Sequence, residues 1–194
     1  EGGIWEEGDL RRDESIRYDF TYLGITPTEV SWGADELDPH IKKYEDERTD
    51  QFNGNLANEW YSGKNFIVLR YADVLLCYAE CLNELGETGE ANTVVNQVRA
   101  RAWGGTLPNE MAWNYGQDEF RVQIMDERIR ELCFEGWRRM DLIRTGKFVE
   151  LIKERNPWAK KSGTIKEFHM RWPIPDTEIK NNSDISEEDQ NPGY

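Results

Sequence analysis

Histidine and cysteine are scarce in this chain of 194 residues, which has two histidines and three cysteines. His40 and His169 lie far from the cysteines, and neither has a further ligand at the spacing of a zinc site. Cys77 and Cys81 are four residues apart on a predicted helix, a geometry that a disulfide seldom accepts. We therefore predict no metal site and no other cofactor, and we interpret all three cysteines as small buried apolar residues.

The sequence also lacks a long apolar run, since none approaches the ~20 residues that a membrane-spanning helix needs. Positive charge is in deficit: 24 Lys and Arg residues stand against 38 Asp and Glu residues, which gives a net charge of -14. A chain with this charge repels both nucleic-acid phosphates and anionic lipid. We expect no nucleic-acid partner.

Motifs of nucleophilic and metal-dependent enzymes are missing as well. The sequence contains no G-x-S-x-G, no H-E-x-x-H and no phosphate-binding glycine loop. Oxygen ligands lie close together at Asp184, Ser186, Glu188 and Asp189, but without the spacing and central glycine of an EF-hand. We interpret this acidic segment as a solvated tail.

The pattern along the chain predicts a single, mainly α-helical domain. Residues 1–64 are rich in Gly, Asp, Asn, Thr and aromatics, which indicates loops and short strands, with strands expected at Ile16–Tyr22 and at Ile41–Tyr44. Residues 65–102 are expected to form a helical hairpin of tetratricopeptide-like size, and residues 117–155 further helices. Residues 156–194 are predicted to be an extended tail.

The hairpin is predicted from two runs of apolar residues at helical spacing. In the first run the apolar face is expected to wrap around more than one side of the helix, and Gly86 supplies a stop. The first run consists of Val74, Leu75, Cys77, Tyr78, Ala79, Cys81 and Leu82, and the second of Ala91, Val94, Val95, Val98 and Ala102.

The most informative segment runs from Glu127 to Gly146, where charged residues recur at three- and four-residue steps between large apolar side chains. Residues so spaced share one face of a helix. Cations beside a carboxylate lower its pKa, whereas a general acid at neutral pH needs a raised pKa. We therefore predict a largely buried structural network that fixes the third helix against the hairpin and consists of Glu127, Glu131, Glu135, Arg138, Asp141 and Arg144.

The same segment supports an enzymatic alternative. Glu131 and Glu135 are four residues apart, which would place two carboxyls within roughly the separation that glycosidases use. The neighbouring Arg128, Arg138 and Arg139 argue against it, because they favour the ionised form of both carboxyls. We favour the structural network and predict no catalytic residue.

Aromatic residues are the remaining functional signal, with eight tryptophans and eight tyrosines. Flat aromatic faces stack on sugar rings but also pack cores, so the position of each must discriminate. Trp137 and Trp172 are expected in the core. The candidates for ligand binding lie in the loop-rich first third among hydrogen-bonding side chains, although core packing is the alternative for each; they are Trp5, Trp32, Trp60 and Tyr61.

Three blocks of sequence, in order, resemble the C-terminal region of SusD/RagB-family nutrient-binding lipoproteins. The blocks are Arg70–Glu80 (RYADVLLCYAE), Glu127–Gly146 (ERIRELCFEGWRRMDLIRTG), and the chain ending Trp172–Ile179 with Gln190–Tyr194 (WPIPDTEI, QNPGY). Together they cover most of residues 65–194. Three ordered blocks make a specific signal, and the resemblance implies that this chain is the C-terminal portion of a longer protein.

The resemblance also implies a function and a location. The whole protein would be a lipid-anchored protein on the cell-surface side of the outer membrane, with the anchor outside this chain. It would bind a glycan, or less often a peptide, and deliver it to a TonB-dependent outer-membrane transporter without breaking a bond. The alternatives are a helical-repeat scaffold for a protein partner and, third, a glycosidase.

Overall fold

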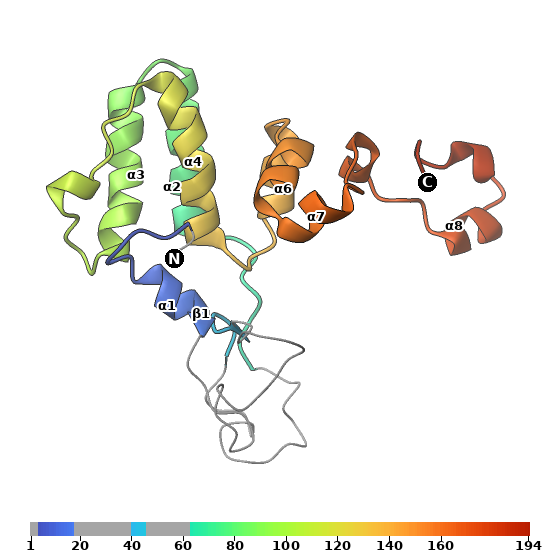
Figure 1. Cartoon of the computed structure of the whole chain (residues 1–194), viewed down its shortest axis with the longest axis horizontal. Helices are drawn as coiled ribbons and strands as arrows, with labels where there is room; N and C mark the ends of the chain where they lie inside the picture. The colour runs from blue at the N-terminus through green and yellow to red at the C-terminus, as the bar shows by residue number, and fades with distance from the viewer. Residues whose placement is uncertain (1–3, 18–39, 46–62) are drawn as a thin grey trace, which may run out of the picture. The chain divides into compact units, whose positions relative to one another are not determined.

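The computed structural model describes residues 4–17, 40–45 and 63–194, and these residues belong to two compact units. Unit 1 ends at Trp137, and unit 2 is Arg138–Tyr194. Helices dominate both units, so the predicted mainly α-helical fold is confirmed (Figure 1). The elements of unit 1 are α1 (Arg11–Ser15), β1 (Ile16–Arg17), β2 (His40–Ile41), α2 (Tyr71–Glu84), α3 (Thr88–Ala102), η3 (Asn109–Met111) and α4 (Gln117–Leu132).

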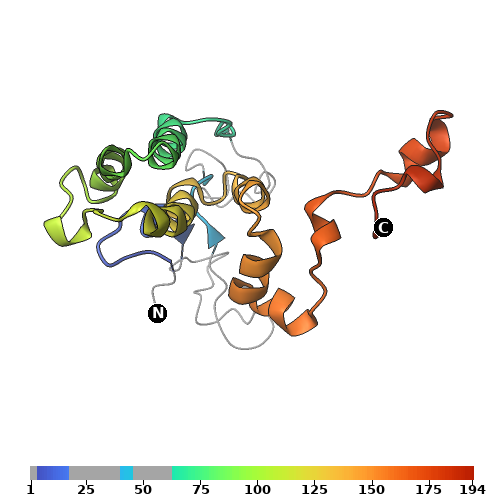
Figure 2. The ribbon, with the colours of Figure 1, turned by 90° about the horizontal axis from the view of Figure 1, so that it is seen from above.

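The predicted hairpin consists of α2 and α3, and α4 packs against it. Seen from above, the three long helices of unit 1 lie side by side (Figure 2). Gly86 ends the first helix as predicted, with a left-handed φ of 86° that an L side chain rarely adopts. The backbone N–H of Gly86 donates to the Asn83 carbonyl at 3.1 Å, and that of Glu87 to the Leu82 carbonyl at 2.9 Å. These bonds satisfy carbonyls that the end of α2 would leave unpaired.

The core of unit 1 lies between the three long helices. Its fully buried apolar side chains are Leu76, Ala79, Ala91, Val95 and Phe120. Only one face of α2 is covered among the described residues, because Val74 and Tyr78 are exposed. The expectation of burial on more than one side of α2 was therefore wrong. So was the interpretation of the cysteines for Cys77 and Cys81, which are exposed, whereas Cys133 is buried.

Two asparagines of α3 fasten the loop between α3 and α4. Asn92 donates its side-chain amide to the Tyr115 carbonyl at 2.9 Å and accepts from the Tyr115 N–H at 3.2 Å. Asn96 makes the same pair of bonds with Trp113, at 3.1 and 2.8 Å. The side-chain amide of each asparagine thus makes the two hydrogen bonds that a neighbouring β-strand would make with one loop residue. The backbone N–H and carbonyl groups of both loop residues are therefore satisfied.

The charged segment from Glu127 to Gly146 does not form one continuous helix. α4 ends at Leu132, and α5 (Arg138–Arg144) begins after a turn. In that turn Phe134 and Gly136 have left-handed φ angles of 64° and 87°, which a continuous right-handed helix excludes.

Unit 2 contains short helices. They are α5, α6 (Phe148–Arg155), α7 (Pro157–Ser162) and α8 (Asp176–Asn181), with two 3₁₀ turns, η4 (Glu167–Met170) and η5 (Glu187–Asp189). α7 and α8 interrupt the segment that the sequence pattern assigned to the tail. Within that segment Gln190 clamps the backbone of Ile174, accepting from its N–H at 2.8 Å and donating to its carbonyl at 3.0 Å.

The loop-rich first third contributes one small sheet to the described residues. β1 and β2 pair antiparallel, with Ile16 opposite Ile41. The strand predicted at Ile16–Tyr22 therefore begins where expected, while its residues from 18 onward lie outside the described residues. The strand predicted at Ile41–Tyr44 is β2, which is shorter and ends at Ile41.

Candidate functional site

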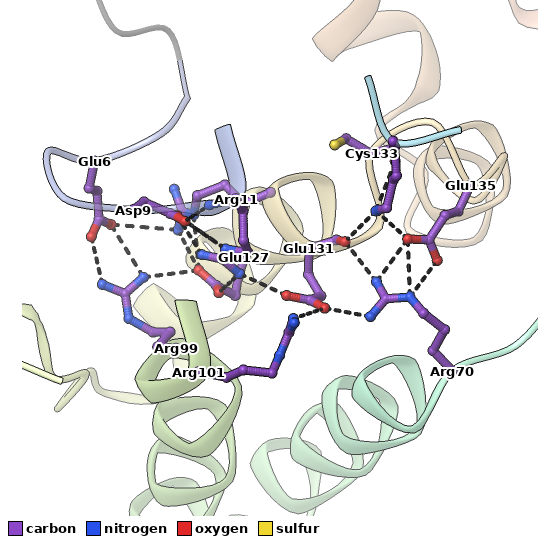
Figure 3. Close-up of polar contacts among 12 residues, drawn as sticks. Glu6, Asp9, Arg11, Arg70, Arg99, Arg101, Glu127, Glu131, Cys133 and Glu135 are labelled. Atoms are coloured by element: carbon purple, nitrogen blue, oxygen red, sulfur yellow. Dashed lines mark hydrogen bonds and ion pairs between the residues drawn. The ribbon is translucent and has the colours of Figure 1, made fainter. Parts of the chain in front are cut away.

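A cluster of ion pairs lies in the interior of unit 1 (Figure 3). It joins two glutamates of α4, and one in the turn after α4, to basic side chains from four other segments. We call it the ionic cluster; its members are Glu127, Glu131, Glu135, Glu6, Asp9, Arg11, Lys43, Arg70, Arg99, Arg101 and Arg130.

Glu127 is at the centre of the ionic cluster and is completely buried. Arg11 Nη1 lies 2.7 Å from its Oε1, while Arg99 Nη1 and Arg130 Nε lie 2.9 Å from its Oε2. Burial alone would raise the pKa of Glu127, but the charges of Arg11, Arg130 and Arg99 outweigh it and hold that pKa below its ordinary value. Glu127 is therefore a permanently charged anchor at neutral pH.

Arg70 bridges the other two glutamates of the cluster. It donates from Nη1 to Glu131 Oε1 at 2.6 Å, and from Nε and Nη2 to the two oxygens of Glu135 at 2.9 and 2.8 Å. Lys43 completes the partners of Glu135, and Arg101 and Arg11 those of Glu131. A planar guanidinium that donates two hydrogen bonds to a carboxylate fixes the orientation of both side chains. Arg70 therefore fixes the start of α2 relative to the end of α4.

The end of α4 is capped by cations instead of by a glycine. Lys43 Nζ donates to the carbonyls of Glu131 and Cys133, each at 3.2 Å, and Arg70 Nη2 donates to the Glu131 carbonyl at 2.8 Å. The last carbonyls of a helix have no partner within it and carry partial negative charge. Two basic side chains from distant segments satisfy them here.

The N-terminal segment 4–17 is attached to the helices through the same cluster. Asp9 Oδ2 lies 2.6 Å from Arg11 Nη2, and Glu6 Oε2 lies 2.6 Å from Arg99 Nη2. Burial alone would lower the pKa of Arg11, but its hydrogen bonds and charge interactions with Asp9 and Glu127 raise it above its ordinary value. Arg11 therefore stays charged and links the segment to α4.

A second buried ion pair holds α4 against α2. Arg128 Nη2 lies 2.9 Å from Asp73 Oδ1, and both side chains are almost entirely excluded from solvent. Arg128 Nη1 also lies 3.4 Å from the Cys77 sulfur. α4 thus makes ionic contacts in two directions, one toward α2 through Arg128 and one toward the N-terminal segment through Glu127.

The arrangement of the three glutamates suits cohesion and not acid catalysis. All six of their carboxylate oxygens are paired with a cation, and their side chains are at most 1% exposed. A glycosidase acid needs a raised pKa and access to the sugar. Groups of three or more acidic, histidine or cysteine side chains suited to a metal ion are absent from residues 4–17, 40–45 and 63–194.

The structure divides the predicted network between the units. Glu127, Glu131 and Glu135 meet in unit 1, and most of their cations come from outside the charged segment, a fact that no local pattern could disclose. Asp141 belongs to unit 2, where it is buried and pairs with Arg144 at 2.9 Å. Arg138 begins α5 and is half-buried.

The four predicted ligand-binding aromatics are only partly accounted for. Trp5 is half-buried, and its indole N–H is buried with no hydrogen-bond partner among the described residues. Trp32, Trp60 and Tyr61 lie outside the described residues.

Two exposed tryptophans of unit 2 were missed by the sequence reasoning. Trp172 is 71% exposed, so its expected place in the core was wrong; the guanidinium of Arg139 lies 4.4 Å from its ring centroid. Trp158 is 79% exposed on α7. The signal that could have found Trp158 is the sequence Asn156-Pro157, an N-cap followed by proline that starts a helix within the presumed tail.

The hairpin, α4 and the ionic cluster define a mainly helical protein in which buried charges join segments far apart in the chain. The chain belongs to the SusD family, whose sequence model matches residues 4–194. SusD-like protein P38 of Formosa agariphila is 41% identical over 155 residues, which are 77% of this chain and 28% of that protein. SusD-like protein P25 of the same organism is 39% identical over 133 residues, 67% of this chain and 25% of that protein.

Two further relatives come from Bacteroides thetaiotaomicron. Its starch-binding protein SusD is 28% identical over 159 residues, which are 79% of this chain and 26% of that protein. The crystal structure of a SusD homolog is 27% identical and superposes with a TM-score of 0.63, covering 96% of this chain and 41% of that chain. The chain thus spans about a quarter of the length of the curated relatives it matches. None of the helices within the described residues has the length and apolar content for crossing a bilayer.

Proposed function

We propose that this chain is the C-terminal region, a single domain, of a protein that binds a glycan at the cell surface and delivers it to a TonB-dependent outer-membrane transporter. Membership of the SusD family supports glycan binding, and one relative is named as a starch-binding protein. A peptide is the less favoured ligand. The protein acts from the outer face of the outer membrane, held there by a lipid anchor.

The observation that carries binding over hydrolysis is the pairing of every carboxylate oxygen of Glu127, Glu131 and Glu135 with a cation. The best carboxyl pair in the sequence, Glu131 and Glu135, is thereby buried against cations, where a sugar does not reach it. The protein then holds its ligand and makes or breaks no bond.

A helical scaffold for a protein partner is the second candidate, and the outer face of α2 favours it. Tyr71, Val74, Tyr78 and Leu85 are exposed and lie three, four and seven residues apart, so they follow one side of the helix. Contiguous apolar surface of this kind is typical of a protein interface.

Affinity electrophoresis of chain 1–194 through gels containing starch, other neutral polysaccharides or acidic polysaccharides tests the proposal. We expect retardation in at least one gel. The aromatic site is tested with Trp5→Ala, Trp32→Ala, Trp60→Ala and Tyr61→Ala, each expected to weaken retardation if it stacks on the sugar; Trp103→Ala, which alters a tryptophan beside Arg99, is the matched control.

A reducing-sugar assay on the same polysaccharides separates binding from hydrolysis. We expect no product. Sustained release that Glu131→Gln abolishes, with an unchanged circular dichroism spectrum, would establish a glycosidase instead. Retardation in none of the gels, together with capture of a defined protein partner that Tyr78→Asp prevents, would favour the scaffold.

A further inference from the structure

Basic charge is concentrated in one stretch of an otherwise acidic chain. Residues 138–171 contain ten Lys and Arg against four Asp and Glu, a net charge of +6, although the whole chain carries -14. Within it, residues 153–166 hold five basic residues and one acidic residue. These residues form the end of α6, all of α7 and the loop that follows.

α7 is completely specified as a helix although it buries no side chain. Asn156 caps its start by accepting from the N–H groups of Trp158 and Ala159, each at 3.0 Å. Pro157 occupies the first turn, and Gly163 ends the helix in the left-handed conformation with φ of 63°. Burial usually stabilises so short a helix, and in α7 the caps at both ends contribute this stabilisation instead.

The surface that α7 presents combines an aromatic ring with cations. Trp158 is 79% exposed, and Lys161 lies three residues on, which places both on one side of the helix. Lys160, the chain neighbour of Lys161, is exposed on another side of α7, and Lys153 is exposed on α6, which packs against α7 (Figure 1). An exposed tryptophan ring lowers the solubility of a protein and does not serve solubility by itself. A ring that can stack on a sugar, next to lysines that can pair with acid groups, suits a charged sugar.

We propose that α7 and the end of α6 form a binding surface for an anionic polysaccharide. One sugar ring stacks on Trp158, while Lys161 and its neighbour Lys160 pair with carboxylate or sulfate groups of the polysaccharide. The inference rests on the proposed function and names the ligand class. A wide anionic partner such as a lipid surface meets the net negative charge of the whole chain and is repelled. A single polysaccharide strand contacts only the local basic residues, and the more distant acidic residues are screened.

Isothermal titration of chain 1–194 with dextran, dextran sulfate and oligogalacturonate tests the inference, because the first two differ only in sulfate. We expect Lys160→Ala/Lys161→Ala to weaken binding of an anionic ligand about tenfold at low salt, the sum of two exposed charge pairs. The loss should nearly vanish in about 1 M NaCl, where the Debye length is about 3 Å. Trp158→Ala should weaken binding about tenfold at both salt concentrations, since stacking is not screened.

Lys180→Ala and Trp172→Ala are the matched controls, because they remove an exposed lysine and an exposed tryptophan elsewhere in unit 2. Both should leave the affinity unchanged. All variants change side chains that bury little surface, and an unaltered circular dichroism spectrum verifies their folds.

The outcomes separate this inference from the proposed function. Binding of neutral glycans with no gain from anionic groups, or anionic binding indifferent to Lys160 and Lys161, overturns the inference and leaves the proposed function standing. Failure to bind any polysaccharide in either assay overturns both. Lysine-dependent binding to vesicles containing anionic phosphatidylglycerol, with no binding to the acidic glycans, overturns the inference in favour of a membrane surface.

Discussion

Unit 1 buries several of its arginine side chains, whereas unit 2 buries none. In unit 1 the side chains of Arg99, Arg128 and Arg130 are at most 6% exposed, and each is ion-paired. In unit 2, all of which the structure describes, no Lys or Arg is buried, and Lys147 is 49% exposed. Charge that is desolvated and paired specifies which segments meet, whereas charge in water remains available to a ligand.

Buried and exposed ion pairs differ in what the loss of one partner costs. A buried ion pair contributes little net stability relative to apolar packing, yet loss of one partner is costly because the other remains charged in a poor solvent. An exposed pair is screened and flexible, so that loss of a partner is nearly neutral. Stability measurements on matched charge deletions should therefore separate unit 1 from unit 2.

The largest effect is expected from Glu127→Ala. It leaves Arg11, Arg99 and Arg130 buried without their shared carboxylate, and the free energy of unfolding should fall by about 3–5 kcal/mol in urea titrations. Glu154→Ala, at an exposed position of unit 2, is the control and should change it by less than about 0.5 kcal/mol. A loss below 1 kcal/mol for Glu127→Ala would remove the distinction between the units.

The stabilisation that Glu127 contributes should be lost at acid pH. Because the pKa of Glu127 is lower in the folded chain than its unfolded value of about 4.3, its stabilisation is complete above that pH and is lost as the pH falls through the lower, folded pKa. Urea midpoints of the native chain should therefore fall in this acidic range. Glu127→Gln cannot titrate at this position, so its midpoints should fall less steeply; equal slopes would show that other groups govern the acid response.

A smaller loss is expected from Glu135→Ala. Its partners Arg70 and Lys43 are 23% and 17% exposed, so water can solvate them once the carboxylate is gone. We expect a cost of about 1–3 kcal/mol. Hydrogen exchange followed by mass spectrometry should locate the loss of protection at the end of α4, with unit 2 unchanged. A cost equal to that of Glu127→Ala would mean that partial exposure does not matter in this cluster.

The smallest effect is expected from Lys147→Ala in unit 2. Its ammonium lies 3.0 Å from Glu150, but both side chains are at least 49% exposed. The change in unfolding free energy should stay below about 0.5 kcal/mol and should disappear in high salt. A loss above 1 kcal/mol would place unit 2 in the same regime as unit 1.

The three long helices of unit 1 were predictable because their signals are local, whereas α1 (Arg11–Ser15) lies in the segment that was predicted to form loops and short strands. Periodicity, Gly86 and the start near Gln117 all act within one or two turns of backbone, and α2, α3 and α4 lie where these signals placed them. The order of three motifs likewise sufficed to identify the family. The end of α4 escaped prediction, because its caps, Lys43 and Arg70, come from other segments.

The sequence by itself therefore determined the helical class, the hairpin and the family, since each depends on residues close together or on their order. Only the tertiary structure decided the partners of Glu127, because Arg11 lies 116 residues away in the chain. It also decided which side of α2 is covered and that Trp172 is exposed. Burial and ion pairing are properties of the places where distant segments meet, and no local pattern of side chains contains that information.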